Sequence, residues 1–197
     1  MPDGRLLDLF PMGVVTLDVE GRLRAANGLA RRILAEGEGL ELRSGRIVAA
    51  RRQDAMALAR FFEDACPSAT AEGLHVRGAM HVSRDSPRPK LTVLVADTHG
   101  RSGASASGFV LFLHQPDVAV SVCETTLRTL HRLTRAEARI AALLVRGHSV
   151  ASIAAEVGSS TNTVRTHLKR VYSKVEVASQ SALIRAVLSG PAALRLG

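Results

Sequence analysis

The chain has 197 residues, of which 26 are Lys or Arg and 18 are Asp or Glu, and its formal net charge is +8. A hydrophobic fraction of 46% beside 22% charged residues is ordinary for a chain with a packed core, which excludes global disorder. No apolar run approaches the roughly 20 residues of a spanning helix, and the N-terminus lacks the shape of a secretory signal. We therefore expect a cytoplasmic protein without membrane contact.

The positive charge is concentrated in the last part of the chain. Residues 1–120 carry 15 basic and 14 acidic side chains, whereas residues 121–197 carry 11 basic and 4 acidic ones. Such asymmetry is typical of a near-neutral module joined to one that meets a polyanion, most plausibly nucleic acid. With no Trp and one Tyr, the chain lacks the aromatic platforms that stack on unpaired bases, so duplex DNA is favoured over single strands.

Residues 1–115 read as a mixed α/β unit that begins with a hairpin. Residues 12–18 are a β-rich run, residues 19–21 form a turn, and residues 22–26 supply the second strand. Asn27 can then cap a helix that stops at Gly37, because its side chain accepts from the first free amides of a helix.

The next elements follow at short intervals. Residues 40–49 predict a second β-rich stretch around a Ser44-Gly45 turn, and Asp54 opens a further helix. Residues 74–82 alternate, which predicts a strand covered on one face, and residues 91–96 and 109–113 are apolar at successive positions, as in strands buried on both faces. The apolar side of the alternating strand comprises Leu74, Val76, Met80 and Val82.

This order of elements resembles a PAS-like sensory domain, above all through residues 11–23 and the helix that starts after Asn27. The resemblance covers roughly residues 5–115 and implies an α+β fold, an antiparallel sheet with helices. PAS-like domains sense a small molecule, bind a cofactor or dimerise, and the sequence does not select among these roles. Neither a cofactor nor a metal site is indicated, since Cys66 and Cys123 lie far apart without a CxxC pair.

Three capped helices follow in the C-terminal part. Thr134 and Glu137 form a Thr-x-x-Glu capping box, which starts a helix that ends at Gly147. Ser149 can cap a second helix over residues 150–157, and Ser160 a third that runs to Val175. Two helices joined by so short a turn, with Gly in it, predict a helix-turn-helix whose second helix enters the major groove.

The outward face of that third helix carries the side chains that suit DNA. Arg165 and Lys169 lie one turn apart and can donate to guanine, and the Thr166 methyl suits thymine, so these three are the expected base-reading residues. The amino end of the helix offers hydroxyl, amide and free backbone N–H groups to phosphate. The expected phosphate-binding residues are Ser149, Ser160, Thr161, Asn162, Thr163, Arg170 and Lys174.

The motifs Leu133-Thr134-x-x-Glu137, Gly147-x-Ser149, Ile153-Ala154 and residues 160–168, followed by Tyr172-x-Lys174, are similar to the LuxR-type helix-turn-helix over about residues 130–190. The resemblance implies an all-α, four-helix DNA-binding domain, here residues 133–197, in a transcription regulator that dimerises through its last helix. The residues that would reach the partner are Leu183, Ile184, Val187 and Leu188.

The sequence also departs from the LuxR-type pattern. Ser152 replaces a common Glu, Ser159 a common aliphatic residue, Glu176 a common Gly and Gln180 a common Arg. The N-terminal half lacks the Trp and Tyr that build the pocket of acyl-homoserine-lactone receptors, so quorum sensing is not implied. Residues 116–132 predict a connecting helix between the two domains.

We therefore expect a one-component regulator in which a PAS-like sensor tunes binding to double-stranded DNA, as a homodimer and with no catalytic role. RNA polymerase and a small-molecule effector are further expected partners. The alternative is a cofactor-bearing sensor or enzyme whose basic tail only docks it to a partner, although no paired carboxylates, metal cluster or activated nucleophile support it. The effector, the target sequence and the choice between activation and repression do not follow from the residues.

Overall fold

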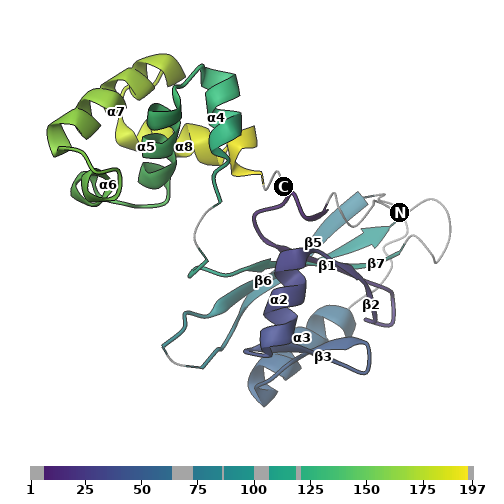
Figure 1. Ribbon diagram of the computed structural model, residues 1–197. Coiled ribbons are helices and arrows are strands. Elements are labelled where there is room, and N and C mark those ends of the chain that lie inside the picture. Colours follow the sequence, from purple (N-terminus) through teal and green to yellow (C-terminus); the bar gives the residue numbers. More distant parts are fainter. Residues whose placement is uncertain (1–6, 64–72, 86, 100–106, 119–120, 195–197) are drawn as a thin grey trace. The chain divides into compact units, whose positions relative to one another are not determined.

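The computed structural model describes residues 7–63, 73–85, 87–99, 107–118 and 121–194. The chain divides into two compact units, Met1–Val118 and Ala119–Gly197, here called the sheet unit and the helical unit (Figure 1). Among the described residues, no helix has the length and apolar character needed to cross a bilayer.

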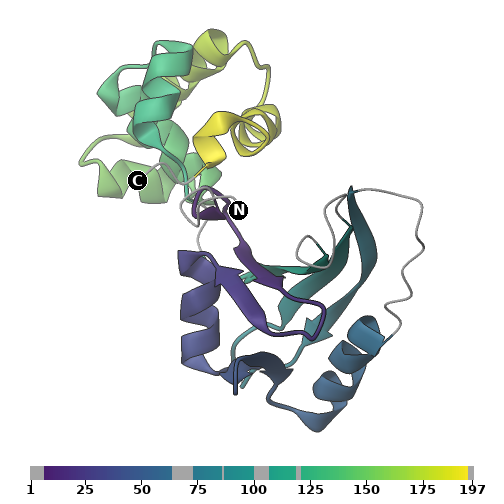
Figure 2. The same cartoon turned by 90° about the vertical axis from the view of Figure 1, so that its right-hand side faces the viewer.

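The sheet unit is built on one antiparallel sheet, whose strands follow the order β2-β1-β7-β6-β5. These strands are β1 (Gly13–Leu17), β2 (Leu23–Ala26), β5 (Gly73–Val82), β6 (Leu91–His99) and β7 (Gly108–His114). Helices α2 (Gly28–Glu36) and α3 (Arg52–Glu63) and the hairpin of β3 (Leu40–Arg43) with β4 (Arg46–Ala49) complete the unit. Figure 2 shows the twist of the strands against one another. The expected fold class, an antiparallel sheet with helices, is confirmed.

Asn27 joins the first hairpin to α2. Its side-chain oxygen accepts from the Ala30 amide at 2.9 Å, which caps the helix, and from the Val14 amide at 3.0 Å. Its amide nitrogen donates to the carbonyl of Met12 at 2.8 Å. The side chain is buried, and these bonds satisfy its polar atoms, so the predicted cap also positions α2 on the sheet.

The core of the sheet unit lies between one face of the sheet and the two helices. Val15, Val93 and Leu111 are fully buried there, together with Leu58 from α3 and Ala30 from α2. Neighbouring residues in β6 and β7 that point to the opposite face are half-buried, so these strands are covered fully on one face and partly on the other.

The predicted facing of β5 is wrong in its first half. A register shift between Val76 and Gly78 places an extra residue in the strand, so that Met80 and Val82 face the core while Leu74 and Val76 face outward. Leu74 is 50% exposed and Val76 64% exposed. Gly78 is required at this irregularity, because a Cβ there would lie 2.6 Å from the ring of Phe61.

A buried arginine holds the end of the sheet unit in place. The guanidinium of Arg84, just after β5, is 2% exposed and lies 3.0 Å from the carboxylate of Asp117 and 3.6 Å from that of Glu36. Asp117 is next to the last residue of the unit, and Glu36 ends α2. The ion pairs therefore tie the chain after β7 to the carboxyl end of α2.

The helical unit contains five α-helices among the described residues. They are α4 (Glu124–His131), α5 (Arg135–Val145), α6 (Val150–Glu156), α7 (Thr161–Val175) and α8 (Gln180–Leu188), followed by the short 3₁₀ turn Pro191–Ala193. Helix α4 is shorter than the connecting helix expected over residues 116–132. Its Leu127 is fully buried in the core of the helical unit, so α4 belongs to that unit.

Candidate nucleic-acid interface

Helices α5, α6 and α7 each begin at a hydroxyl residue, as the sequence predicts. The Thr134 hydroxyl accepts from the Glu137 amide, and the Glu137 carboxylate accepts from the Thr134 amide at 2.8 Å, which completes the capping box. Ser149 and Ser160 accept from the amides of Ser152 and Thr163, each at 3.1 Å. The starts of all three helices are therefore fixed by local sequence.

The turn between α6 and α7 has the geometry of a helix-turn-helix. Gly158 has a φ of 65°, in the left-handed region that favours glycine, and the Ser159 amide donates to the Ala154 carbonyl at 2.9 Å. Three residues of α7, Val164, Leu168 and Val171, are buried against the rest of the unit. One side of α7 is thus anchored, and its opposite side is presented to solvent.

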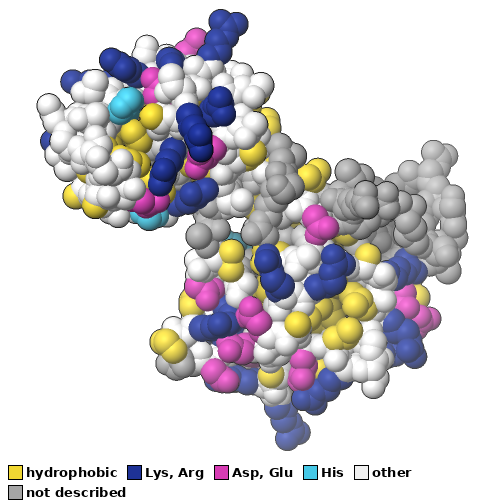
Figure 3. Space-filling model, in the orientation of Figure 1, with side chains coloured by type: hydrophobic (Ala, Val, Ile, Leu, Met, Phe, Trp, Pro, Cys, Tyr) yellow, Lys and Arg dark blue, Asp and Glu magenta, His cyan; other side chains and the backbone are white. Residues whose placement is uncertain are grey.

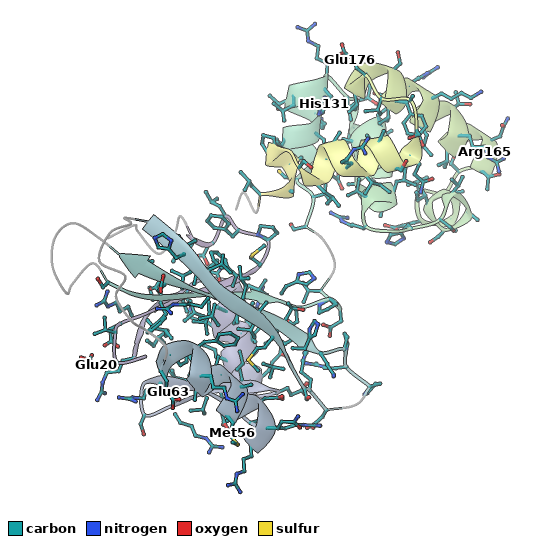
Figure 4. The ribbon with its side chains drawn as sticks, turned by 180° about the vertical axis from the view of Figure 1, so that it is seen from behind. Glu20, Met56, Glu63, His131, Arg165 and Glu176 are labelled. Carbon is teal, nitrogen blue, oxygen red and sulfur yellow. The ribbon has the colours of Figure 1, made fainter. Side chains whose placement is uncertain are left out.

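The three expected base-reading residues, Arg165, Thr166 and Lys169, all lie on the exposed side of α7. Arg165 and Lys169 are one turn apart, a rise of about 6 Å. Figure 4 shows Arg165 projecting outward from α7. The Thr166 hydroxyl donates to the Asn162 carbonyl at 3.0 Å, which leaves its methyl as the free contact group. The structure therefore brings the three side chains together on one surface.

The cations of this surface are available to an outside partner. In the described part of the helical unit, the ion pairs engage His148 and Lys174 and leave Arg165, Lys169 and Arg170 without a carboxylate. Figure 3 shows Lys and Arg side chains outnumbering Asp and Glu on the visible face of the helical unit, and a more even mixture on the sheet unit. The excess positive charge is the arrangement that phosphate binding uses.

The amino end of α7 exposes the residues expected to meet phosphate. Ser160, Thr161, Asn162 and Thr163 are all exposed. The hydroxyls of Ser160 and Thr163 lie 2.9 Å apart, and the Ser160 hydroxyl also caps the Thr163 amide. The first amides of a helix lack intrahelical acceptors and carry the positive end of its dipole, so Thr161 and Asn162 offer backbone donors here. Ser149 is exposed at the start of α6, and Arg170 follows the expected base-reading residues on α7.

Lys174 has a different position from the one expected at a DNA phosphate. Its ammonium lies 2.7 Å from the carboxylate of Glu137 and 3.2 Å from the carbonyl oxygen of Arg132. Burial raises the pKa of Glu137, but hydrogen bonds from Lys174 and Thr134 outweigh that effect and hold the pKa below its ordinary value. Lys174 thus joins the last turn of α7 to the first turn of α5. The capping box was visible in the sequence, whereas this partner, 37 residues away, was not.

The expected dimerisation residues divide into two pairs. Leu183 is 0% exposed and Val187 2%, because both pack into the core of the helical unit. The prediction that Leu183 and Val187 contact a partner subunit is wrong. A helical periodicity of apolar residues also results when that face packs against the other helices of the same unit. Ile184 is partly buried and Leu188 is 41% exposed, so these two remain at the surface of α8.

Comparisons with known proteins agree with this geometry. Residues 131–187 match the family described as bacterial regulatory proteins, luxR family. Over 58 residues the chain is 38% identical to an Aeromonas salmonicida protein described as an HTH-type transcriptional regulator. The match covers 29% of this chain and 30% of the relative, so the chain spans less than a third of that relative's length.

Two solved structures are similar over most of the chain. One is the phage VqmA–DPO complex, with 16% identity, a TM-score of 0.40, and coverage of 94% of this chain and 86% of the other. The other is the Vibrio cholerae VqmA dimer in the absence of target DNA, with 17% identity, a TM-score of 0.35, and coverage of 94% and 85%. The family match, together with the capped and anchored α7, establishes that the helical unit contains a helix-turn-helix domain of the luxR family of bacterial regulatory proteins.

Proposed function

We propose that the protein is a one-component transcription regulator that binds double-stranded DNA through α7, with its affinity tuned by the sheet unit. The observation that carries the proposal is the pair of unpaired cations, Arg165 and Lys169, on the exposed side of a helix whose other side is buried. An arginine can donate two hydrogen bonds to guanine, and a lysine one. With the Thr166 methyl beside them, the helix can read about one half-site.

The proposed contacts to the DNA backbone lie before and after the base-reading residues on α7. The amino end of α7 would meet one phosphate, through backbone N–H groups as well as side chains. We leave Lys174 out of this set, because its ammonium is held by Glu137 inside the domain. The proposed phosphate-binding residues are Ser149, Ser160, Thr161, Asn162, Thr163 and Arg170.

The further partners follow from membership of a family of regulators. We propose that two copies bind a two-fold site, with Ile184 and Leu188 on α8 as the contact between them. RNA polymerase would be met by the DNA-bound dimer, and a small-molecule effector by the sheet unit. In this proposal the protein acts in the cytoplasm and has no catalytic role.

Selection of bound duplexes from a random library, followed by affinity measurements, tests the proposal. Arg165→Ala and Lys169→Ala should each reduce affinity for the selected duplex by about 1–3 kcal/mol and relax selectivity at the base pair that each contacts. Arg128→Ala is the matched control, since it removes the same charge from an exposed position on α4. Undiminished affinity and selectivity in the Arg165/Lys169 double variant would contradict the assignment of α7 as the reading helix.

Salt dependence separates reading from phosphate binding. The logarithm of affinity should fall linearly with the logarithm of salt concentration, with a slope of about −0.9 for each phosphate contact. Arg170→Ala should make that slope about 1 less steep and weaken binding to all duplexes equally. A sequence-dependent loss on Arg170→Ala would instead place Arg170 among the base readers.

A further inference from the structure

The sheet unit carries a groove of about 450 Å³ that opens at the edge of its packed core. Its described lining comes from α3, from β4 and from the turn that joins β1 to β2. Val95 and Leu111 are fully buried and Leu58 is 2% exposed, so they belong to the packed core between the sheet and the helices. The groove lies at the side of α3, at the edge of that core.

The floor and walls of the groove are apolar. Ile47 and Leu58, both buried, form part of the floor, and Ala59 and Phe62 line it from α3. The ring of Phe62 is held edge-on against that of Phe109, with centroids 4.9 Å apart, so this wall is fixed by the core behind it. The apolar part of a small molecule could therefore be buried here, out of contact with water, without rearrangement of the protein.

The rim of the groove carries an excess of negative charge. Glu20, from the turn, and Glu63, at the end of α3, both line it and are opposed by one cation, Arg46. Figure 4 shows Glu20 and Glu63 on the same side of the sheet unit. Asp18, a further carboxylate of the same turn, lies two residues before Glu20, and a hydrogen bond from the Arg22 backbone lowers its pKa.

We infer that the groove binds a small organic cation, an ammonium or amidinium head on a hydrocarbon body, with the head at Glu20 and Glu63. A metal ion fits less well, because the described residues contain no group of three or more side chains able to hold one. The site stands on the geometry of the sheet unit alone. Its consequence for DNA binding, that occupancy changes affinity for the duplex, rests on the proposed function.

Calorimetric titration of the full chain with n-alkylammonium ions, from butyl to decyl and below their micellar concentrations, tests the site directly. Affinity should rise by up to about fourfold for each added methylene until the groove is full. Alkanoates of equal length, which carry the opposite charge, should bind at least about tenfold more weakly. Equal binding of the two series would overturn the inference.

Variants of the lining test the position of the site. Glu20→Gln and Glu63→Gln should each lower octylammonium affinity about fivefold, the effect of one charge at about 4 Å in water, and Arg46→Gln should raise it. Ala59→Phe should block the groove. Met56→Phe is its control, because Met56 lies on the same helix, is 57% exposed and does not line the groove. If the two Phe variants bind octylammonium equally, the cation does not occupy this groove.

Duplex affinity with and without octylammonium then separates this inference from the proposed function. A chain that binds octylammonium but no duplex would refute the proposed function and leave the site standing. A chain that binds a selected duplex but shows no octylammonium binding would refute the site and leave the function standing.

Discussion

Glu176 offers a sharp test of how helix α7 ends. It follows α7 with φ 59° and ψ 43°, the left-handed conformation, at a position where LuxR-type sequences commonly have Gly. Figure 4 places it at the end of α7 opposite to Arg165. This conformation costs a residue with a Cβ about 1–2 kcal/mol, whereas glycine adopts it freely. Glycine also has more conformational freedom in the unfolded chain, which reduces the stabilisation by about 0.5–1 kcal/mol.

We therefore expect Glu176→Gly to stabilise the helical unit by about 1 kcal/mol, or about 4–8 °C in Tm for a unit of this size. Urea unfolding of the full chain by tyrosine fluorescence is the assay. The chain has no Trp and one Tyr, and Tyr172 lies on α7, so the signal reports on the helical unit alone. Burial raises the pKa of Tyr172, so the phenol stays neutral throughout.

Glu176→Gln is the control for charge, because it removes the carboxylate from the negative end of the helix dipole and keeps the Cβ. It should gain only a few tenths of a kcal/mol. If Glu176→Gly is no more stable than Glu176→Gln, the left-handed conformation is not a strain on this helix, and the reasoning fails.

Four further substitutions test contacts described above. Lys174→Met should cost about 2 kcal/mol near neutral pH, because Glu137 then stays buried and ionised without its cation. Lys174 lowers the pKa of Glu137, so the bond contributes stability while the carboxylate is ionised and loses that contribution as pH falls. The difference in stability between the wild-type chain and the variant, measured by urea unfolding between pH 7 and pH 4, should therefore shrink toward pH 4. Leu183→Ala should lower the free energy of unfolding by about 2–5 kcal/mol in the same assay, because Leu183 is buried. Leu188→Ala should change it by less than about 0.5 kcal/mol, because Leu188 is exposed, but should weaken self-association measured by sedimentation. Arg84→Met should destabilise the sheet unit by about 1–3 kcal/mol, measured by thermal unfolding followed by circular dichroism. This is less than the cost of breaking a fully buried ion pair, because the carboxylate partners of Arg84 are partly exposed. An unchanged stability would show that these ion pairs do not stabilise the unit.

Local signals in the sequence were reliable where the structure depends on neighbouring residues. The Asn27 cap, the Thr134 capping box and the serine caps of α6 and α7 were all predicted and are all confirmed. A cap is a contact between residues two or three apart, so both partners can be recognised within a short stretch of sequence. For the same reason the exposed face of α7, including Arg165 and Lys169, could be predicted from spacing alone.

Predictions that needed distant partners were less secure. The alternation of β5 gave no sign of the irregularity before Gly78, which turns Leu74 and Val76 outward, because a bulge is set by pairing with β6. The apolar stripe of α8 could not distinguish its own core from a partner, and Leu183 proved to be core. Nothing in the sequence distinguishes Lys174 from the other basic residues of α7, whereas the structure places its ammonium 2.7 Å from the Glu137 carboxylate.

The bond between Lys174 and Glu137 also bears on what regulation can change. It joins the two ends of a 37-residue stretch, and α5, α6 and α7 also share one buried core, so we expect these three helices to move together. A signal from elsewhere in the protein can shift or release that piece, but it cannot easily rotate the reading face of α7 within it. Under the proposed function, we therefore expect a ligand of the sheet unit to change the fraction of DNA sites occupied while the preferred base sequence stays constant, so that target choice and responsiveness can evolve independently.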